Sequence, residues 1–205
     1  MSHAGLMASE AAPVVAEEDL ARAQLYRLLA SLLARPASGE DISFVAAMKG
    51  DDTELGQRIE ALARAAREVD PEELPHEYHA LFIGLGRGEL VPYGSYYLTG
   101  FLHEKPLARL RGDMKELGIS RDPSVREPED HIAALMDMMA GLILGEFDAP
   151  ASLDSQRRLF EGHVSPWAKH FFRDLEAARS SAFYAAVGGV GQVFLDIEEV
   201  AFSME

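Results

Sequence analysis

The stretch that decides the fold reads IAALMDMMAGLI and spans residues 132–143. Its apolar residues recur three or four positions apart, so they share one face of a helix. This stripe consists of Ile132, Leu135, Met136, Met139, Leu142 and Ile143. Gly145 follows directly, and glycine is a common stop signal for a helix. The stretch therefore predicts a helix with a strong apolar face that ends near Gly145.

The same helical period recurs along most of the chain. Further helices are predicted from the acidic residues 17–19 to Pro36, and at 44–48, 55–69, 74–85, 107–117, 153–163, 166–179 and 183–202. No alternating run suits a strand, and no internal repeat is present. We therefore predict an all-α chain of about eight or nine helices, packed as a single globular bundle.

The chain divides into a short tail and one helical domain. Residues 1–16 contain Pro13 but no Lys or Arg, so they predict a flexible N-terminal tail rather than a secretory signal. Residues 17–205 have the length of one domain. Within it, the polar segment 119–126 is the best candidate for an internal hinge. Exchange of C-terminal helices about that hinge would give a domain-swapped dimer in place of a monomer.

Composition excludes several classes of protein. The 205 residues include 19 Lys and Arg against 34 Asp and Glu, a net charge of −15. Such a field repels phosphate backbones and anionic membrane surfaces, so neither nucleic acid nor a membrane is an expected partner. The chain has no cysteine, which rules out disulfides, thiolate clusters and thiol nucleophiles. No apolar run reaches the ~18–20 residues of a spanning helix, and the default compartment is the cytoplasm.

Signatures of catalysis are weak. The glycine-rich run Gly84–Gly88 follows a helix and lacks the Lys-Ser/Thr pair of a phosphate loop. His76 and His79 are three residues apart, whereas the zinc-protease motif requires four. We expect no enzyme, no metal and no cofactor. The alternative is a small helical nucleotide-binding switch or enzyme that uses the Gly84–Gly88 loop.

Tyrosines cluster in the segment VPYGSYY, residues 91–97. A tyrosine is apolar in its body and polar at its tip, which suits a groove for a peptide. The competing interpretation is that the rings fill the core. We prefer the core for Leu81 and Phe82, just before this segment, and leave both interpretations open for Tyr93, Tyr96 and Tyr97.

A second cluster is the segment EPEDH, residues 127–131. Proline and acidic residues are ordinary at the start of a helix. The three carboxylates of Glu127, Glu129 and Asp130 also form a local negative pole that suits a guanidinium ion. His131 lies four residues after Glu127, which would offset the cost of an imidazolium at a positive helix end.

In this order, the motifs resemble the TorD/DmsD-like family of cytoplasmic chaperones for exported molybdoenzymes. The resemblance rests on Tyr78-x-x-Leu81-Phe82-x-Gly84, Pro92-Tyr93-x-Ser95-x-Tyr97, Glu127-Pro128-x-Asp130-His131 and His163-Val164-x-Pro166-Trp167-x-x-x-Phe171. It covers residues 20–199. The chain departs from the family at Gly84–Gly88, where many relatives carry a proline after the glycine of the first motif.

The resemblance implies a TorD-like all-helical fold and a defined partner. That partner is the twin-arginine signal peptide and apo form of a molybdenum-cofactor oxidoreductase, held competent for cofactor insertion before export. By motif position, the implied peptide-binding residues are Asp130, His131, Glu127, Tyr93, Ser95 and Tyr97. Trimethylamine-oxide reductase, dimethyl-sulfoxide reductase and formate dehydrogenase are all open as clients. Weak guanine-nucleotide binding by some relatives keeps the nucleotide alternative open, and an assembly factor that binds a folded partner through residues 93–97 is another alternative.

Overall fold

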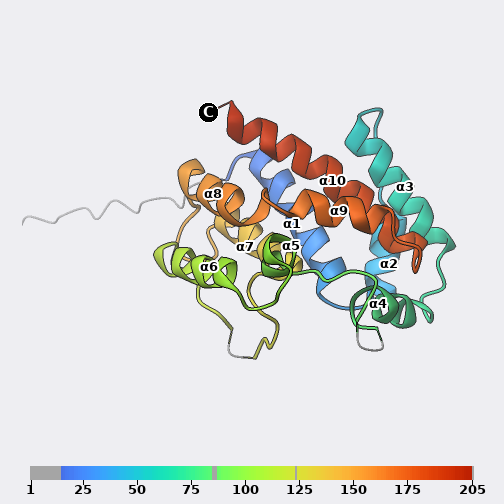
Figure 1. Cartoon of the computed structure of the whole chain (residues 1–205). Coiled ribbons are helices and arrows are strands. Elements are labelled where there is room, and N and C mark those ends of the chain that lie inside the picture. The colour runs from blue at the N-terminus through green and yellow to red at the C-terminus, as the bar shows by residue number, and fades with distance from the viewer. Residues whose placement is uncertain (1–14, 85–86, 123, 205) are drawn as a thin grey trace, which may run out of the picture.

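The computed structural model describes residues 15–84, 87–122 and 124–204. The described part of the chain is all-α and has no strand, as predicted; an isolated bridge pairs Tyr93 with His131 (Figure 1). Its helices are α1 (Glu17–Ala34), α2 (Gly39–Ala46), α3 (Glu54–Glu68), α4 (Leu74–Phe82), α5 (Gly94–Thr99), α6 (Lys105–Glu116), α7 (Ile132–Leu144), α8 (Leu153–Leu159), the π-helical turn η1 (Phe160–Val164), α9 (Ala168–Glu176) and α10 (Ala182–Ser203).

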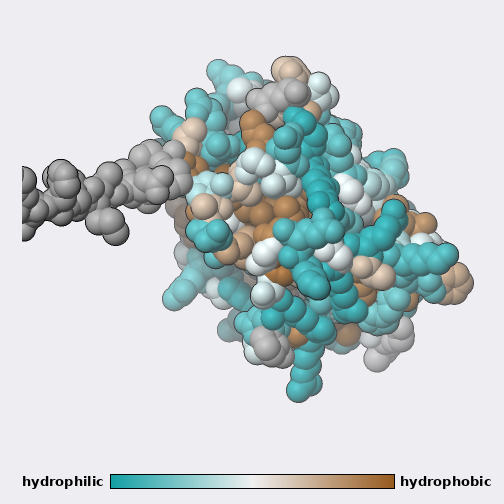
Figure 2. All heavy atoms as spheres, turned by 90° about the vertical axis from the view of Figure 1, so that its left-hand side faces the viewer, coloured by the Kyte–Doolittle hydropathy of each residue, from teal (hydrophilic) through white to brown (hydrophobic). Residues whose placement is uncertain are grey.

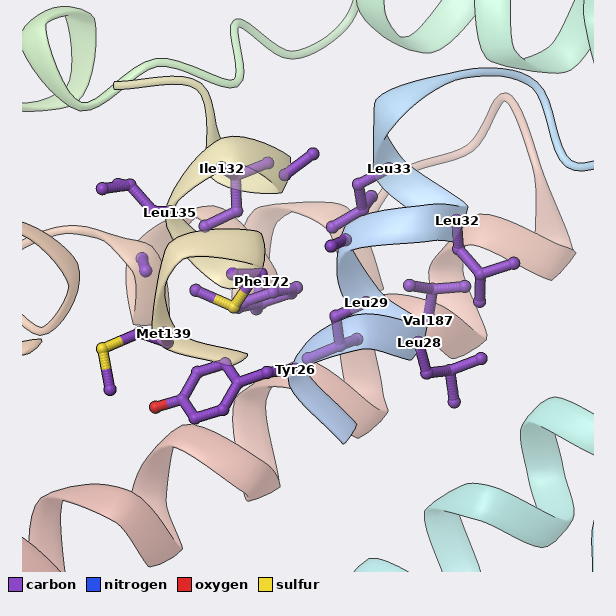
Figure 3. Close-up of a cluster of buried hydrophobic side chains, with 14 of the residues drawn as sticks. Tyr26, Leu28, Leu29, Leu32, Leu33, Ile132, Leu135, Met139, Phe172 and Val187 are labelled. Carbon is purple, nitrogen blue, oxygen red and sulfur yellow. The ribbon is translucent and has the colours of Figure 1, made fainter. Parts of the chain in front are cut away.

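Helix α7, the predicted central stripe, lies in the core. Almost all of its residues are buried, because α1 packs along one side while α8 and η1 contact it elsewhere. Side chains of α1 and α7 meet in one cluster, which Phe172 of α9 and Val187 of α10 join (Figure 3). Burial of each such large apolar side chain contributes roughly 1.5–3 kcal/mol. A helix that is apolar on all sides is stable only when it is covered on all sides.

Both ends of α7 are defined by local chemistry. At its C-terminus Gly145 adopts a φ of 76°, a left-handed conformation that glycine tolerates, and its N–H donates to the Gly141 carbonyl. At its N-terminus His131 is the capping residue. The predicted stop at Gly145 is therefore confirmed, and the start of α7 coincides with the end of the EPEDH segment.

The structure differs from the predicted helices in one start, one omitted helix and one change of helix type, besides shifts of two or three residues at other ends. Helix α2 starts earlier than residue 44, because Ser38 and Asp41 form a capping box that begins the helix at Gly39. Phe44 is therefore turned outward and is 65% exposed. Helix α5 has only six residues, too few for a readable stripe, and its omission leaves the predicted number of helices below the ten α-helices of the described residues. The predicted helix 153–163 changes to π-helical geometry at Phe160.

The predicted tail and hinge lie at the margins of the described residues. Only residues 15 and 16 of the predicted 1–16 tail are described. The predicted hinge at 119–126 connects α6 to α7, and Pro123 within it lies outside the described residues. Helix exchange about this connection stays a prediction. None of the helices in the described ranges combines the length and apolar character needed to cross a bilayer.

Candidate functional site

The two sequence-predicted motifs meet where α5 and α7 begin. The backbone N–H of Gly94 donates to the Asp130 carbonyl at 2.9 Å, and the N–H of Ile132 donates to the Pro92 carbonyl at 2.9 Å. Gly94 is required at this crossing, because a Cβ there would lie 2.8 Å from the indole Nε1 of Trp167. Residues 127–131, which we call the EPEDH turn, and residues 91–97 are therefore one structural unit.

Asp130 lies inside this unit. Its side chain is buried, and its Oδ2 accepts the backbone N–H of Ser95 at 2.7 Å. Its Oδ1 and the Ser95 hydroxyl have no hydrogen-bond partner among the described residues. A cavity of about 10 Å³ borders Asp130, close to the smallest volume that holds one water molecule. Asp130 thus holds the start of α5 through its bond to the Ser95 N–H.

His131 is a neutral cap rather than a cation. Burial lowers its pKa to about 4, although Glu127 and Asp130 favour the charged form. Its Nδ1 accepts the N–H of Ala133 at 3.1 Å, which satisfies one of the free donors of α7. The expectation that Glu127 offsets a charged imidazole is therefore wrong, because loss of hydration outweighs the attraction of both carboxylates.

Glu127 and Tyr93 form the outer part of the unit. Glu127 is exposed and accepts a hydrogen bond from the Tyr93 hydroxyl. Burial, together with that hydrogen bond, raises the pKa of Tyr93 well above its ordinary value, so the phenol keeps its proton. The Tyr93 ring lies edge-on to His131, with ring centroids 5.1 Å apart. Glu127 thus presents an oriented carboxylate to solvent.

Glu129 does not share that outer face. It is buried, and its Oε2 accepts from Arg111 Nε at 3.0 Å and from Arg111 Nη2 at 2.8 Å. Arg121 Nε lies 3.7 Å from its Oε1. Burial alone would raise the pKa of Glu129, but the hydrogen bonds from Arg111 hold it below its ordinary value. The three carboxylates therefore form no common pole, because Glu129 is already neutralised by cations of the same chain.

The remaining predicted site residues, Ser95 and Tyr97, do not reach the outer face of the unit. The Ser95 side chain is fully buried. The Tyr97 hydroxyl donates to Asp174 at 3.1 Å, and its ring lies 5.3 Å from that of Trp167. Tyr96 contacts Arg87, whose guanidinium carbon lies 5.1 Å from the ring centroid. Of the six predicted residues, Glu127 and Tyr93 reach the outer face of the unit, Asp130 and His131 support it, and Ser95 and Tyr97 belong to α5 and its packing.

Trp167, from the last motif of the family resemblance, is part of the core. Trp167 is buried, and its indole N–H donates to the His163 carbonyl at 2.7 Å, one helical turn earlier. Trp167 is therefore a core residue that lies between helices and not a surface contact. The glycine loop falls partly outside the description, since residues 85 and 86 are not among the described ones.

Sequence reasoning missed an apolar groove between α1 and α2. Its volume is about 890 Å³, and most of its lining is aliphatic or aromatic. Leu20, Leu28 and Phe44 contribute to its walls, and Ile59 and Leu144 extend it to α3 and α7. Figure 2 shows that a largely hydrophilic surface also carries an area of hydrophobic atoms framed by polar side chains. Phe44 could have indicated this groove, because a short capped helix buries few side chains and an aromatic residue on it can stay exposed.

The charges around this groove are mostly acidic. Glu40 and Asp41 line it, and Arg27 is the one basic side chain among the described lining residues. Arg27 is already paired with Asp137 and Glu146. Large exposed apolar patches of this kind mark binding sites for proteins or peptides.

Comparison with known proteins gives consistent matches. The sequence model described as nitrate reductase delta subunit matches residues 49–173. The chain is 29% identical over 187 residues to the chaperone protein TorD of Photobacterium profundum, covering 80% of this chain and 86% of that protein. It is 26% identical over 198 residues to the chaperone protein TorD of Aliivibrio fischeri, covering 86% and 92%.

Among solved structures, the chain is similar to a putative redox enzyme maturation protein from Archaeoglobus fulgidus. The TM-score is 0.54 at 22% identity, and the match covers 87% of this chain and 93% of that one. At this identity the similarity establishes the all-α fold.

Proposed function

The chain belongs to the nitrate reductase delta subunit family and is TorD-like, and on that premise we propose that it is a chaperone for a molybdenum-cofactor oxidoreductase. It binds the twin-arginine signal peptide of the apo precursor in the cytoplasm and holds the precursor competent for cofactor insertion before export. The names of the TorD relatives support the chaperone role, since they match along nearly their whole length. The chain itself then performs no catalysis.

The observation that carries the peptide-binding proposal is the outward carboxylate of Glu127. A carboxylate accepts two parallel N–H bonds from a guanidinium, which makes it a natural partner for an arginine side chain. Tyr93 orients this carboxylate, and both belong to a unit that the buried hydrogen bond from Ser95 to Asp130 holds together. In this proposal Glu127 and Tyr93 contact the peptide, while Asp130, His131 and Ser95 are positioning residues. Tyr97 positions α5 through its contact with Trp167.

We propose that the α1–α2 groove binds an apolar segment of the same precursor. Its lining is apolar, and its acidic surroundings suit a segment that also carries arginine. Helix α7 connects the two surfaces, with His131 at its start and Leu144 in the groove. Its 13 residues rise about 1.5 Å each, or roughly 20 Å in total, a span that about six extended residues cover. One unfolded segment is long enough to reach both surfaces.

The test is calorimetric titration of the full chain with a twin-arginine signal peptide. The matched control is the same peptide with both arginines replaced by lysine, which keeps the charge but loses the bidentate geometry. We expect the arginine peptide to bind at least tenfold more tightly, with affinity falling as salt rises. Equal weak heats from both peptides would contradict the proposal.

A further inference from the structure

We propose that the pocket beside the C-terminal end of α6 binds a small phosphate-bearing anion. The pocket lies in a basic part of an acidic chain. Residues 105–126 contain six basic and three acidic side chains, a net charge of +3 in a protein of net −15. Neither the fold nor the peptide-binding proposal requires such a reversal of charge.

The acidic side chains of this segment are engaged outside the pocket. Asp113 and Glu116 both pair with Arg158, and Asp122 accepts hydrogen bonds from the backbone and hydroxyl of Ser124. The carboxylate that does line the pocket is Glu129. The local positive charge is therefore not cancelled within the segment itself.

The pocket has a volume of about 250 Å³ and three basic side chains in its lining, Arg111, Lys115 and Arg121. The buried Glu129 carboxylate accepts two hydrogen bonds from Arg111, and its other oxygen lies 3.7 Å from Arg121 Nε. Arg121 Nη2 donates to the carbonyls of Val125 and Arg126, which holds this guanidinium beside the pocket. Glu129 neutralises one of the three positive charges, which leaves a net charge of +2 at the pocket. Glu129 accepts hydrogen bonds from Nε and Nη2 of Arg111, so the N–H groups of Nη1 can donate to a ligand.

The chemistry of this lining selects phosphate. Two guanidinium groups and an ammonium, with the Ser120 hydroxyl beside them, provide the charged donors that phosphate oxygens prefer. The volume lies below the range of roughly 300–1,000 Å³ that is typical for drug-sized ligands. A single phosphate group fits this size better than a whole nucleotide. The group can come from inorganic phosphate or from the terminal phosphoryl group of a larger molecule that extends into solvent.

The pocket is separate from the surface proposed for the peptide. Glu129 turns toward Arg111, whereas Glu127, two residues earlier, turns toward Tyr93. Because Glu127 and Glu129 point in different directions, the EPEDH turn has an acidic face at Glu127 and a basic face at the pocket. A ligand of the basic face can be tested without the signal peptide.

The experiment measures thermal unfolding and calorimetric binding of the full chain with sodium phosphate, against sodium chloride at equal ionic strength. Binding to the folded state alone raises the melting temperature, and we expect a rise of about 2 °C or more at saturating phosphate. Lys115→Ala should weaken phosphate binding at least fivefold. The Lys115 side chain is exposed and forms no ion pair within the described residues, so this variant should fold normally.

The matched control is Lys49→Ala, which removes the same charge from an exposed lysine outside the pocket. Phosphate that stabilises no better than chloride would overturn the proposal, and so would equal effects of Lys115→Ala and Lys49→Ala. A nucleoside triphosphate is the second probe. If it binds more tightly than phosphate and depends on Lys115, the source is a larger phosphorylated molecule; if phosphate binds equally well or better, the source is the free anion.

A last titration separates this pocket from the peptide site. The twin-arginine peptide should bind wild type and Lys115→Ala with the same affinity. Failure of the phosphate test would therefore leave the proposed chaperone function standing, and failure of the peptide test would leave the anion pocket standing.

Discussion

Two regions of this molecule reverse the usual distribution of side chains. At the EPEDH turn the polar side chains of Asp130 and His131 are buried, whereas at the α1–α2 groove the large apolar side chain of Phe44 is exposed. Buried polar groups specify one local structure, because each must keep its hydrogen bond. Exposed apolar groups contribute little to folding and remain available for a partner. Substitutions at the turn should therefore act mainly on stability, and substitutions at the groove mainly on binding.

The largest expected effect is the pH dependence of stability caused by His131. Its pKa is about 4 in the folded state, and a free histidine has a pKa of about 6.5, so the unfolded chain binds the extra proton between these values. Stability therefore falls as the pH drops from 7.5 to 4.5, and this one group contributes a loss of roughly 2–3 kcal/mol. Urea unfolding at both pH values measures this effect.

The control for His131 is His131→Asn, which retains a capping side chain without the titration. Buried or paired carboxylates add their own acid sensitivity in both proteins, so the difference between the two slopes isolates His131. An equal pH dependence in wild type and His131→Asn would contradict the assignment of a buried neutral imidazole.

The next effect concerns Asp130. Asp130→Ala leaves the buried N–H of Ser95 without its acceptor, and we expect a loss of about 2 kcal/mol in the free energy of unfolding. Asp130→Asn keeps an oxygen at this position and should lose less. Denaturant titration with circular dichroism checks both variants. If Asp130→Asn kept full stability but lost binding of the twin-arginine peptide, Asp130 would be a direct contact and not a positioning residue.

Glu127 should show the opposite balance. Glu127→Gln keeps a partner for the Tyr93 hydroxyl but removes the exposed charge, so stability should change by less than about 0.5 kcal/mol. Affinity for the twin-arginine peptide should fall about tenfold, or roughly 1.4 kcal/mol. Calorimetric titration measures this change, with the exposed Glu72→Gln as the matched loss of charge. A similar loss of affinity in both variants would show only a general charge effect.

The smallest expected effect is at the groove. Phe44→Glu places a charge in the apolar wall and should weaken binding of an apolar precursor segment by roughly 1 kcal/mol, about fivefold. Phe101→Glu is the control, because Phe101 is 69% exposed and lies outside the groove. Fluorescence anisotropy of a labelled precursor peptide compares the two variants, which should unfold at nearly the same denaturant concentration. Equal binding by both would remove the groove from the proposed mechanism.

The sequence predicted most of the helical framework. The stripe at 132–143 and its stop at Gly145 depend on local periodicity and backbone conformation, and the structure confirms both. Apolar periodicity could not predict the short helix α5 or the π-helical turn at Phe160, because neither shows a full 3.6-residue pattern. Local sequence thus defines long helices well and short or irregular ones poorly.

The candidate site was only partly predictable. Residues 91–97 and 127–131 are recognisable in the sequence as two separate motifs. Their pairing through the backbone of Gly94 and Ile132 depends on tertiary structure. The acidic residues of the turn have the same local pattern whether they are buried or exposed. Arg111 and Ser95, which decide that outcome for Glu129 and Asp130, come from elsewhere in the chain.

The contact between Gly94 and Trp167 has a practical consequence. Trp167 is the single tryptophan of the chain, and its indole lies against the residue that pairs with the Asp130 carbonyl. Its emission therefore reports on α5 and the EPEDH turn without any attached dye. Any ligand that shifts α5 by a fraction of an ångström would alter the intensity or wavelength of that emission, so binding at this unit can be followed by intrinsic fluorescence.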